Sequence, residues 1–95
     1  MTTYKLVFKR DAEKEWSKLD GSIRQQFAKK LRERLSNPRV ESSRVNGMQD
    51  CYKIKLRSAG YRLVYQVRDT ELVVSVVAVG KRERNQVYKI AIKRI

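Results

Sequence analysis

The chain of 95 residues contains no histidine, one cysteine and one proline, and it has only 10 acidic residues against 23 lysines and arginines. Without histidine, the usual proton shuttle near neutral pH is missing. The lone cysteine, Cys51, excludes an intramolecular disulfide, and together with the lack of histidine it argues against a zinc site. We therefore expect no metal and no cofactor, and this use of cysteine favours a reducing compartment, the cytoplasm.

Long apolar runs are also lacking. No stretch is apolar enough to span a bilayer, and no segment has the pattern of a signal peptide. A long basic amphipathic helix with bulky apolar residues is missing too, so we do not expect a membrane as partner. Because the chain has no repeats, low-complexity tracts or linkers, we expect a single domain over residues 1–95.

The charge is strongly one-sided, with a formal net charge of +13. Such an excess costs stability through self-repulsion and indicates a polyanionic partner. Nucleic acid is the first candidate, and an acidic protein that masks the charge is compatible with it. The hydrophobic content of 41% is sufficient for a folded domain.

The first 38 residues read as a strand followed by two helices. Alternating side chains predict a strand over residues 4–9. Apolar side chains then recur at helical spacing in two segments separated by Gly21. The first contains Ala12, Trp16 and Leu19, and the second contains Ile23, Phe27, Leu31 and Leu35. We expect Asp11 to cap the first helix and Ser22 to cap the second, in a box with Gln25. The helices should form an antiparallel pair that ends before Pro38.

The rest of the chain reads as a loop, three strands and a helix. Residues 39–49 lack a clear period, and strands are predicted over residues 51–57, 61–68 and 72–79. The last strand is apolar on both faces, so it belongs inside the sheet. A C-terminal helix is predicted from about residue 83. The predicted fold class is α+β: a mainly antiparallel four-stranded sheet with an N-terminal helical hairpin and a C-terminal helix, the helices lying on one face.

The predicted hairpin concentrates positive charge. Because side chains alternate across a strand, Lys53, Lys55 and Arg57 share one face of the first arm, and Arg62 lies on the same face of the second. Neither arm contains an acidic residue, although like charges on neighbouring strands repel. Cations clustered without counter-charges form a phosphate-binding site. The alternative is a merely solvated surface.

The pairing of the two arms depends on the length of the loop between them. A two-residue loop at Ala59-Gly60 would place Arg57 opposite Arg62 and keep the core residues of both arms on one face. A three-residue loop would mix the two faces. We therefore predict an even-length loop.

A second group of cations follows the last strand, namely Lys81, Arg82 and Arg84. If that strand lies beside the hairpin, Arg82 emerges at the edge of the same face. A lysine among cations has a lowered pKa and can act as a general base, and arginine suits the charge that develops on a phosphoryl group. Since RNA brings its own nucleophile, the 2′-hydroxyl, these residue types allow RNA cleavage with neither histidine nor metal.

Two sequence blocks carry a resemblance to a known family: DCYKIKLRSAGYRLVYQV and VGKRERNQVY, preceded by KEWSKLDGSIRQQFAKKL. Together they resemble the RelE family of toxin-antitoxin ribonucleases over nearly the whole chain. The resemblance implies a compact α+β fold and an endoribonuclease that enters the ribosomal A site, on 16S rRNA, and cleaves the mRNA codon there. Attack by the 2′-hydroxyl would leave a 2′,3′-cyclic phosphate and a 5′-hydroxyl.

The resemblance also implies roles for five residues. Lys55 would be the general base, and Lys53 would support it by charge. Arg62 would steady the pentacoordinate phosphate. Arg82 would assist the leaving 5′-oxygen, as acid or by charge, although an arginine pKa above about 12 favours the second role. Tyr88 would stack on or orient the scissile nucleotides.

The expected partners are the ribosome with its mRNA, an acidic RelB-like antitoxin that displaces or covers the C-terminal helix, and operator DNA bound through the antitoxin. The basic side of the second predicted helix either binds ribosomal RNA or is merely solvated. Asn46 departs from the family, which carries a basic residue at this position before the glycine. Two other functions stay open: a ParE-like inhibitor of DNA gyrase, and a nucleic-acid-binding module without activity.

Overall fold

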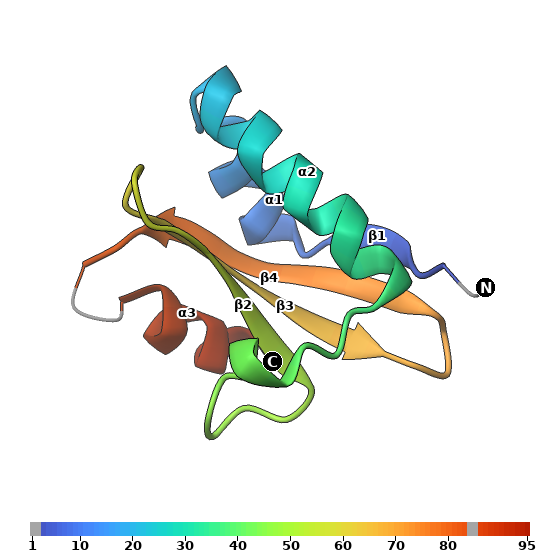
Figure 1. The fold of residues 1–95 in the computed structure, drawn as a ribbon. Coiled ribbons are helices and arrows are strands. Elements are labelled where there is room, and N and C mark those ends of the chain that lie inside the picture. Colours follow the sequence, from blue (N-terminus) through green and yellow to red (C-terminus); the bar gives the residue numbers. More distant parts are fainter. Residues whose placement is uncertain (1–2, 84–85) are drawn as a thin grey trace.

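The computed structural model describes residues 3–83 and 86–95. Its elements, in chain order, are β1 (Lys5–Phe8), α1 (Arg10–Ser17), α2 (Gly21–Ser36), the short 3-10 helix η1 (Glu41–Ser43), β2 (Cys51–Leu56), β3 (Tyr61–Arg68), β4 (Val73–Lys81) and α3 (Gln86–Arg94) (Figure 1). None of the helices in these two ranges is long and apolar enough to cross a membrane.

The four strands form one sheet in the order β1-β4-β3-β2. β2 and β3, and β3 and β4, pair antiparallel, whereas β1 pairs with β4 in parallel. The predicted α+β class with a mainly antiparallel sheet is confirmed. The apolar β4 lies inside the sheet, as its residues on both faces require.

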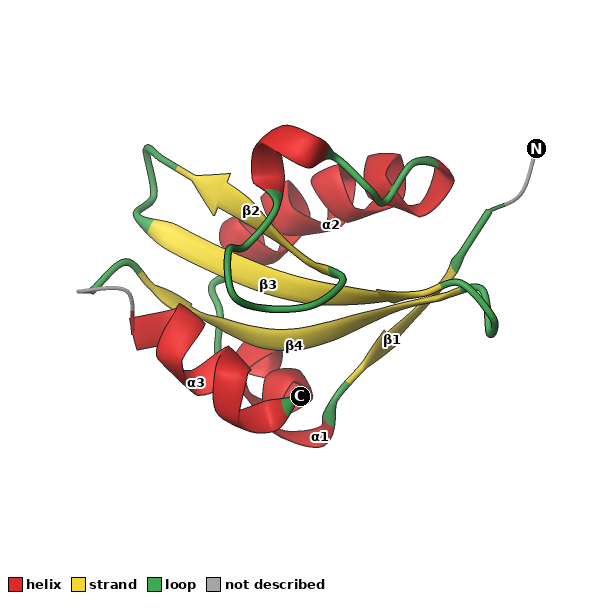
Figure 2. Ribbon diagram, turned by 90° about the horizontal axis from the view of Figure 1, so that it is seen from below, coloured by secondary structure: helices red, strands yellow, loops and turns green. Residues whose placement is uncertain are grey.

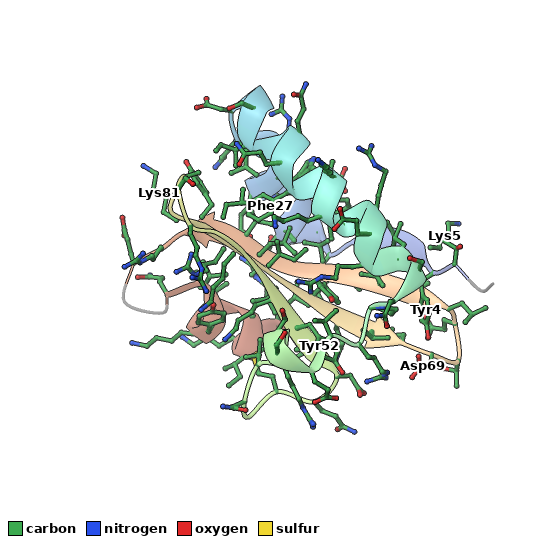
Figure 3. All side chains as sticks on the ribbon, viewed as in Figure 1. Tyr4, Lys5, Phe27, Tyr52, Asp69 and Lys81 are labelled. Carbon is green, nitrogen blue, oxygen red and sulfur yellow. The ribbon has the colours of Figure 1, made fainter. Side chains whose placement is uncertain are left out.

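Helices cover both faces of the sheet, so the predicted one-sided arrangement is wrong. In Figure 1, α1 and α2 lie above the sheet and α3 lies below it, and Figure 2 shows α3 running along β4. On the first face Phe27 of α2 packs into a core with Ile54 and Leu63 (Figure 3). On the second face α3 packs over Val64 and Val77. Since these two valines point away from α2, a second apolar layer is needed to bury them.

The helix starts differ from the predicted caps. Lys9 occupies the N-cap of α1 and Asp20 that of α2, and neither makes a side-chain cap bond. Asp11 and Ser22 instead lie in the first turns. The backbone N–H of Lys9 donates to the carbonyl of Val76, which keeps residue 9 in the sheet until the helix begins. Asp11 still places negative charge at the N-terminal end of the helix dipole.

The hairpin between β2 and β3 closes through residues 57–60. Lys55 pairs with Arg62, and Arg57 lies in the turn. The even-length loop is therefore confirmed, but the predicted pairing of Arg57 with Arg62 is wrong by two residues. The N–H of Gly60, which has φ +72°, donates to the carbonyl of Leu56 at 2.8 Å and closes a longer turn. A shift of two residues leaves every side chain on its expected face.

An ion pair fastens α3 to the sheet beyond the end of β1. The guanidinium of Arg94 donates to both carboxylate oxygens of Glu15, at 2.9 and 3.0 Å, and to the carbonyl of Val77 at 2.9 Å. Glu15 also accepts the N–H of Val79 at 3.1 Å. These bonds satisfy backbone groups of β4 that no longer face β1, and they connect α1, β4 and α3.

Candidate active site

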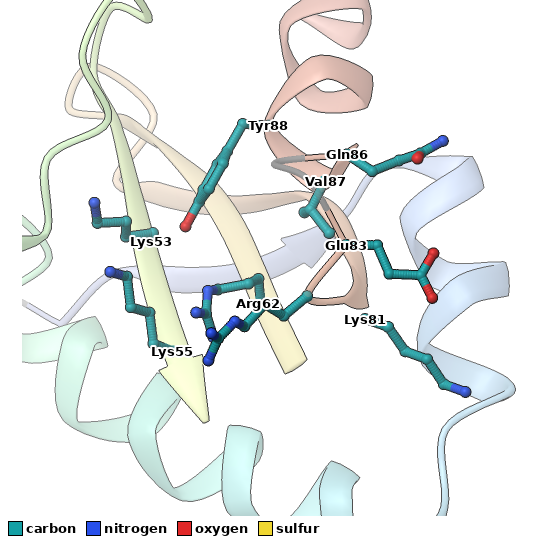
Figure 4. A pocket seen from close by; sticks show the side chains of 9 residues that line it. Lys53, Lys55, Arg62, Lys81, Glu83, Gln86, Val87 and Tyr88 are labelled. Atoms are coloured by element: carbon teal, nitrogen blue, oxygen red, sulfur yellow. The ribbon is translucent and has the colours of Figure 1, made fainter. Parts of the chain in front are cut away.

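A cavity of about 250 Å³ lies where the part of the hairpin next to its turn meets the start of α3 (Figure 4). Its walls are formed by Lys53, Lys55, Arg62, Lys81, Arg82, Glu83, Gln86, Val87 and Tyr88. All five site residues that the resemblance implies are in this set, so the structure brings them together. Arg84, the third cation of its cluster, lies outside the described residues.

The hairpin supplies three of the cations. Lys53 and Lys55 are two residues apart on β2 and share a face, and Arg62 of β3 lies directly opposite Lys55. Directly opposite Arg62, the next strand carries no side chain, because Gly80 of β4 lies there. A Cβ at Gly80 would lie 3.1 Å from a methyl of Val87, so the glycine allows α3 to approach β4 and close the cavity.

Arg82 follows β4 directly and is tied to the hairpin turn. Its backbone N–H donates to the carbonyl of Gly60 at 2.7 Å. This bond places Arg82 beside the start of β3, where it lines the same cavity as Arg62. The predicted emergence of Arg82 at the edge of the basic face is confirmed.

Tyr88 reaches the cavity from α3. The centroid of its ring lies 5.9 Å from Nζ of Lys53, a cation–π arrangement. Figure 4 shows its hydroxyl pointing toward the strands that carry Lys53 and Arg62. The hydroxyl is buried and has no hydrogen-bond partner among the described residues. A buried polar group without a partner costs free energy, so it is a candidate for contact with a bound ligand.

The crowded cations change the acidity of one of them. The charge of Lys53 lowers the pKa of Lys55, and partial burial and the charges of Arg62, Arg57 and Arg82 act in the same direction. A lowered pKa increases the neutral fraction of Lys55 near neutral pH, which is the form that accepts a proton.

Other chemistries find little support around the cavity. Figure 4 shows Glu83 pointing away from Lys53, Lys55 and Arg62. Within residues 3–83 and 86–95, no group of three acidic or thiol side chains could hold a metal ion. Cys51 is fully buried, and burial raises the pKa of its thiol to about 11, so it is a poor nucleophile. The site offers amines, guanidinium groups and a phenol, a set suited to a phosphate diester.

The sequence did not single out two features of the cavity. Gly80 and Val87 shape it, although neither carries a polar side chain that would indicate a site. A glycine at the end of an otherwise apolar strand was the available signal, because it marks close approach of another element.

We expect the substitution Lys53→Gln to raise the pKa of Lys55, because it removes the like charge that most strongly disfavours protonation of Lys55. An NMR titration of lysine side chains measures it directly. Lys5→Gln is the matched control, since Lys5 lies on β1 at the far end of the sheet from Lys81 (Figure 3). An unchanged Lys55 titration in the Lys53 variant would contradict this electrostatic coupling.

Tyr88→Phe should raise the free energy of unfolding by about 1 kcal/mol, because it removes a buried hydroxyl that has no partner. Tyr65→Phe is the matched control: its hydroxyl donates to the carbonyl of Pro38 at 2.6 Å and accepts from Arg34 at 2.9 Å, so its loss should destabilise. Denaturant unfolding measures both. A loss of stability in Tyr88→Phe would mean that its hydroxyl is bonded in the free protein.

Comparison with known proteins shows the family of the chain. Residues 6–86 match the family model described as ParE toxin of type II toxin-antitoxin system, parDE. The mRNA interferase toxin RelE of Escherichia coli (strain K12) is 59% identical over 92 residues, which cover 97% of each chain.

Two solved structures are also similar. A mutant of the E. coli toxin RelE in the free state has a TM-score of 0.91 and 56% identity, covering 98% of both chains. The intact E. coli RelBE toxin-antitoxin complex contains a chain with a TM-score of 0.82 and 58% identity, covering 85% of this chain and 99% of that chain. The cavity, the fold and these matches lead to one conclusion: the chain belongs to the RelE/ParE family of toxins from type II toxin-antitoxin systems.

Proposed function

We propose that this toxin, a single domain over residues 1–95, is a ribosome-dependent endoribonuclease that cleaves mRNA in the ribosomal A site and so inhibits translation. The observation that carries the proposal is the convergence of Lys53, Lys55, Arg62, Arg82 and Tyr88 on one cavity. The E. coli relative that is 59% identical bears the name mRNA interferase, which favours RNA cleavage over the gyrase inhibition of a ParE-like toxin.

The reaction begins with proton transfer from the substrate. Neutral Lys55 accepts the proton of the 2′-hydroxyl, and the 2′-oxygen attacks the adjacent phosphorus atom. The bond from the 2′-oxygen to phosphorus forms as the bond from phosphorus to the 5′-oxygen breaks. The products are a 2′,3′-cyclic phosphate and a 5′-hydroxyl, whose proton comes from solvent beside Arg82. No step requires a metal ion.

The remaining groups stabilise the charge of the transition state. Arg62 and Lys53 hold the non-bridging phosphate oxygens, and Arg82 offsets the negative charge on the leaving 5′-oxygen. Tyr88 orients the nucleotide, with its ring beside Lys53 and its hydroxyl free to bind a phosphate or ribose oxygen. The cavity holds only a single linkage, which does not fix the path of the mRNA on either side. The ribosome therefore supplies the in-line positioning of the mRNA.

The partners follow from charge and family. A net charge of +13 suits 16S rRNA and mRNA, and also an acidic RelB-like antitoxin. The E. coli relative forms a RelBE toxin-antitoxin complex. We propose that the antitoxin displaces or covers α3, that the pair binds operator DNA through the antitoxin, and that the toxin acts in the cytoplasm.

Lys55→Ala and Arg62→Ala should each slow cleavage of the A-site codon by roughly 10²- to 10³-fold, because one removes the base and the other a charge that binds the transition state. Binding to the programmed ribosome should largely survive. Toeprinting measures cleavage and co-sedimentation measures binding, with Lys5→Ala as control.

Two results would contradict the nuclease proposal. Equal loss of binding and cleavage in the variants would mean that Lys55 and Arg62 only dock the protein. Intact mRNA with the parent protein, together with arrested DNA supercoiling by gyrase, would establish the ParE-like alternative.

A further inference from the structure

A second basic surface lies on the outer side of β2, beneath α2. Two hollows of about 320 and 340 Å³ lie there, and they share the lining residues Lys30, Lys55 and Arg57, so they form one continuous groove. We call it the α2–β2 groove; its cations are Lys30, Arg34, Lys53, Lys55 and Arg57. No acidic side chain is among the described residues that line either hollow.

Arg34 is held in this groove as a fixed charge. Its half-buried guanidinium donates to the hydroxyls of Tyr65 at 2.9 Å and Ser43 at 3.2 Å, and to a backbone carbonyl of β2 at 3.4 Å. All three acceptors are neutral. Arg39 and Arg94, which are also held by several bonds, each bind a carboxylate. In the described parts of the chain Arg34 has no carboxylate partner, so the groove keeps a preorganised positive charge that an anion can satisfy.

The groove and the cavity meet at the edge of the sheet. Lys53 and Lys55 line both the α2–β2 groove and the cavity. β2 is the outermost strand, and the two side chains lie between the groove and the cavity. An isolated bridge between Arg44 and Tyr52 covers the start of the β2 edge. The remainder of that edge runs along the groove, where an edge strand presents backbone N–H groups as further donors.

We propose that the α2–β2 groove binds the phosphate backbone of the substrate RNA next to the linkage that is cut. This inference rests on the proposed function and extends it to a second contact on the same strand. Continuity through Lys53 and Lys55 favours the substrate over a separate ribosomal RNA segment. Phosphates held in the groove and the cavity together restrict rotation of the linkage between them, which favours in-line attack.

The test uses a charge-neutralised groove on programmed ribosomes. Lys30→Gln and Arg57→Gln are combined, because both side chains are exposed and their loss leaves the Arg34 bonds intact. Lys14→Gln with Lys18→Gln is the matched control, which removes two exposed charges from the α1 side. Rates are compared at alkaline pH, since Arg57 also lowers the pKa of Lys55.

The groove variant should need about tenfold more protein for half-maximal cleavage, and the slope of log affinity against log salt should fall by about two. The maximal rate should change less than the affinity. The control should resemble the parent protein.

Messenger RNAs with one neutral methylphosphonate linkage beside the cleaved one identify the occupant. At one position this change should weaken mRNA cleavage by the parent protein but not by the groove variant. The neutral linkage and the groove substitutions remove the same contact, so their effects do not add.

Three results would overturn the inference. In the first, the groove variant behaves like the control. In the second, the groove variant loses affinity equally for every methylphosphonate mRNA, which would assign the groove to ribosomal RNA or protein. If the parent protein leaves unmodified mRNA intact, the proposed function itself fails, and the inference fails with it.

Discussion

Repulsion among cations on adjacent strands is the constraint around which the site is built. Lys55 lies directly opposite Arg62 and two residues from Lys53, an arrangement that opposes sheet formation. The opposite face of the same strands offsets this cost, because Ile54 and Leu63 are buried there against α2. The core therefore holds the charges at a separation they would not adopt in solution, and the lowered pKa of Lys55 is the chemical consequence.

The face of the sheet that α3 covers adds the wall of the cavity that the hairpin lacks. Gly80 leaves room for Val87, and the bonds of Arg94 to Glu15 and Val77 hold the far end of α3 against β4. With α3 fixed at both ends, Tyr88 lies over Lys53 and closes the cavity. An antitoxin that removed α3 would take away the wall that Tyr88 forms, whereas Lys53 and Lys55 would stay in place on β2.

The face that each side chain occupies could be predicted from sequence, because strand alternation has a period of two and survives a register shift of two. The shift itself could not, since it depends on the turn that Gly60 closes with φ +72°. The placement of α3 could not be predicted either. Val64 and Val77 are as apolar as the residues on the other face, so hydrophobicity alone does not show which face α3 covers. Tyr88 came only from the family resemblance. Arg34, one of several cations on α2, is distinguished by its tertiary contacts to Tyr65 and Ser43.

The pH dependence of single-turnover cleavage by ribosome-bound protein tests most directly whether crowded charge makes Lys55 a base. Only neutral Lys55 accepts a proton, so log rate should rise with a slope of about one up to its pKa and then level off. Because Lys53 lowers that pKa, Lys53→Gln should move the plateau to higher pH. A rate that is flat between about pH 6 and 9 in the parent protein would contradict a titrating lysine base.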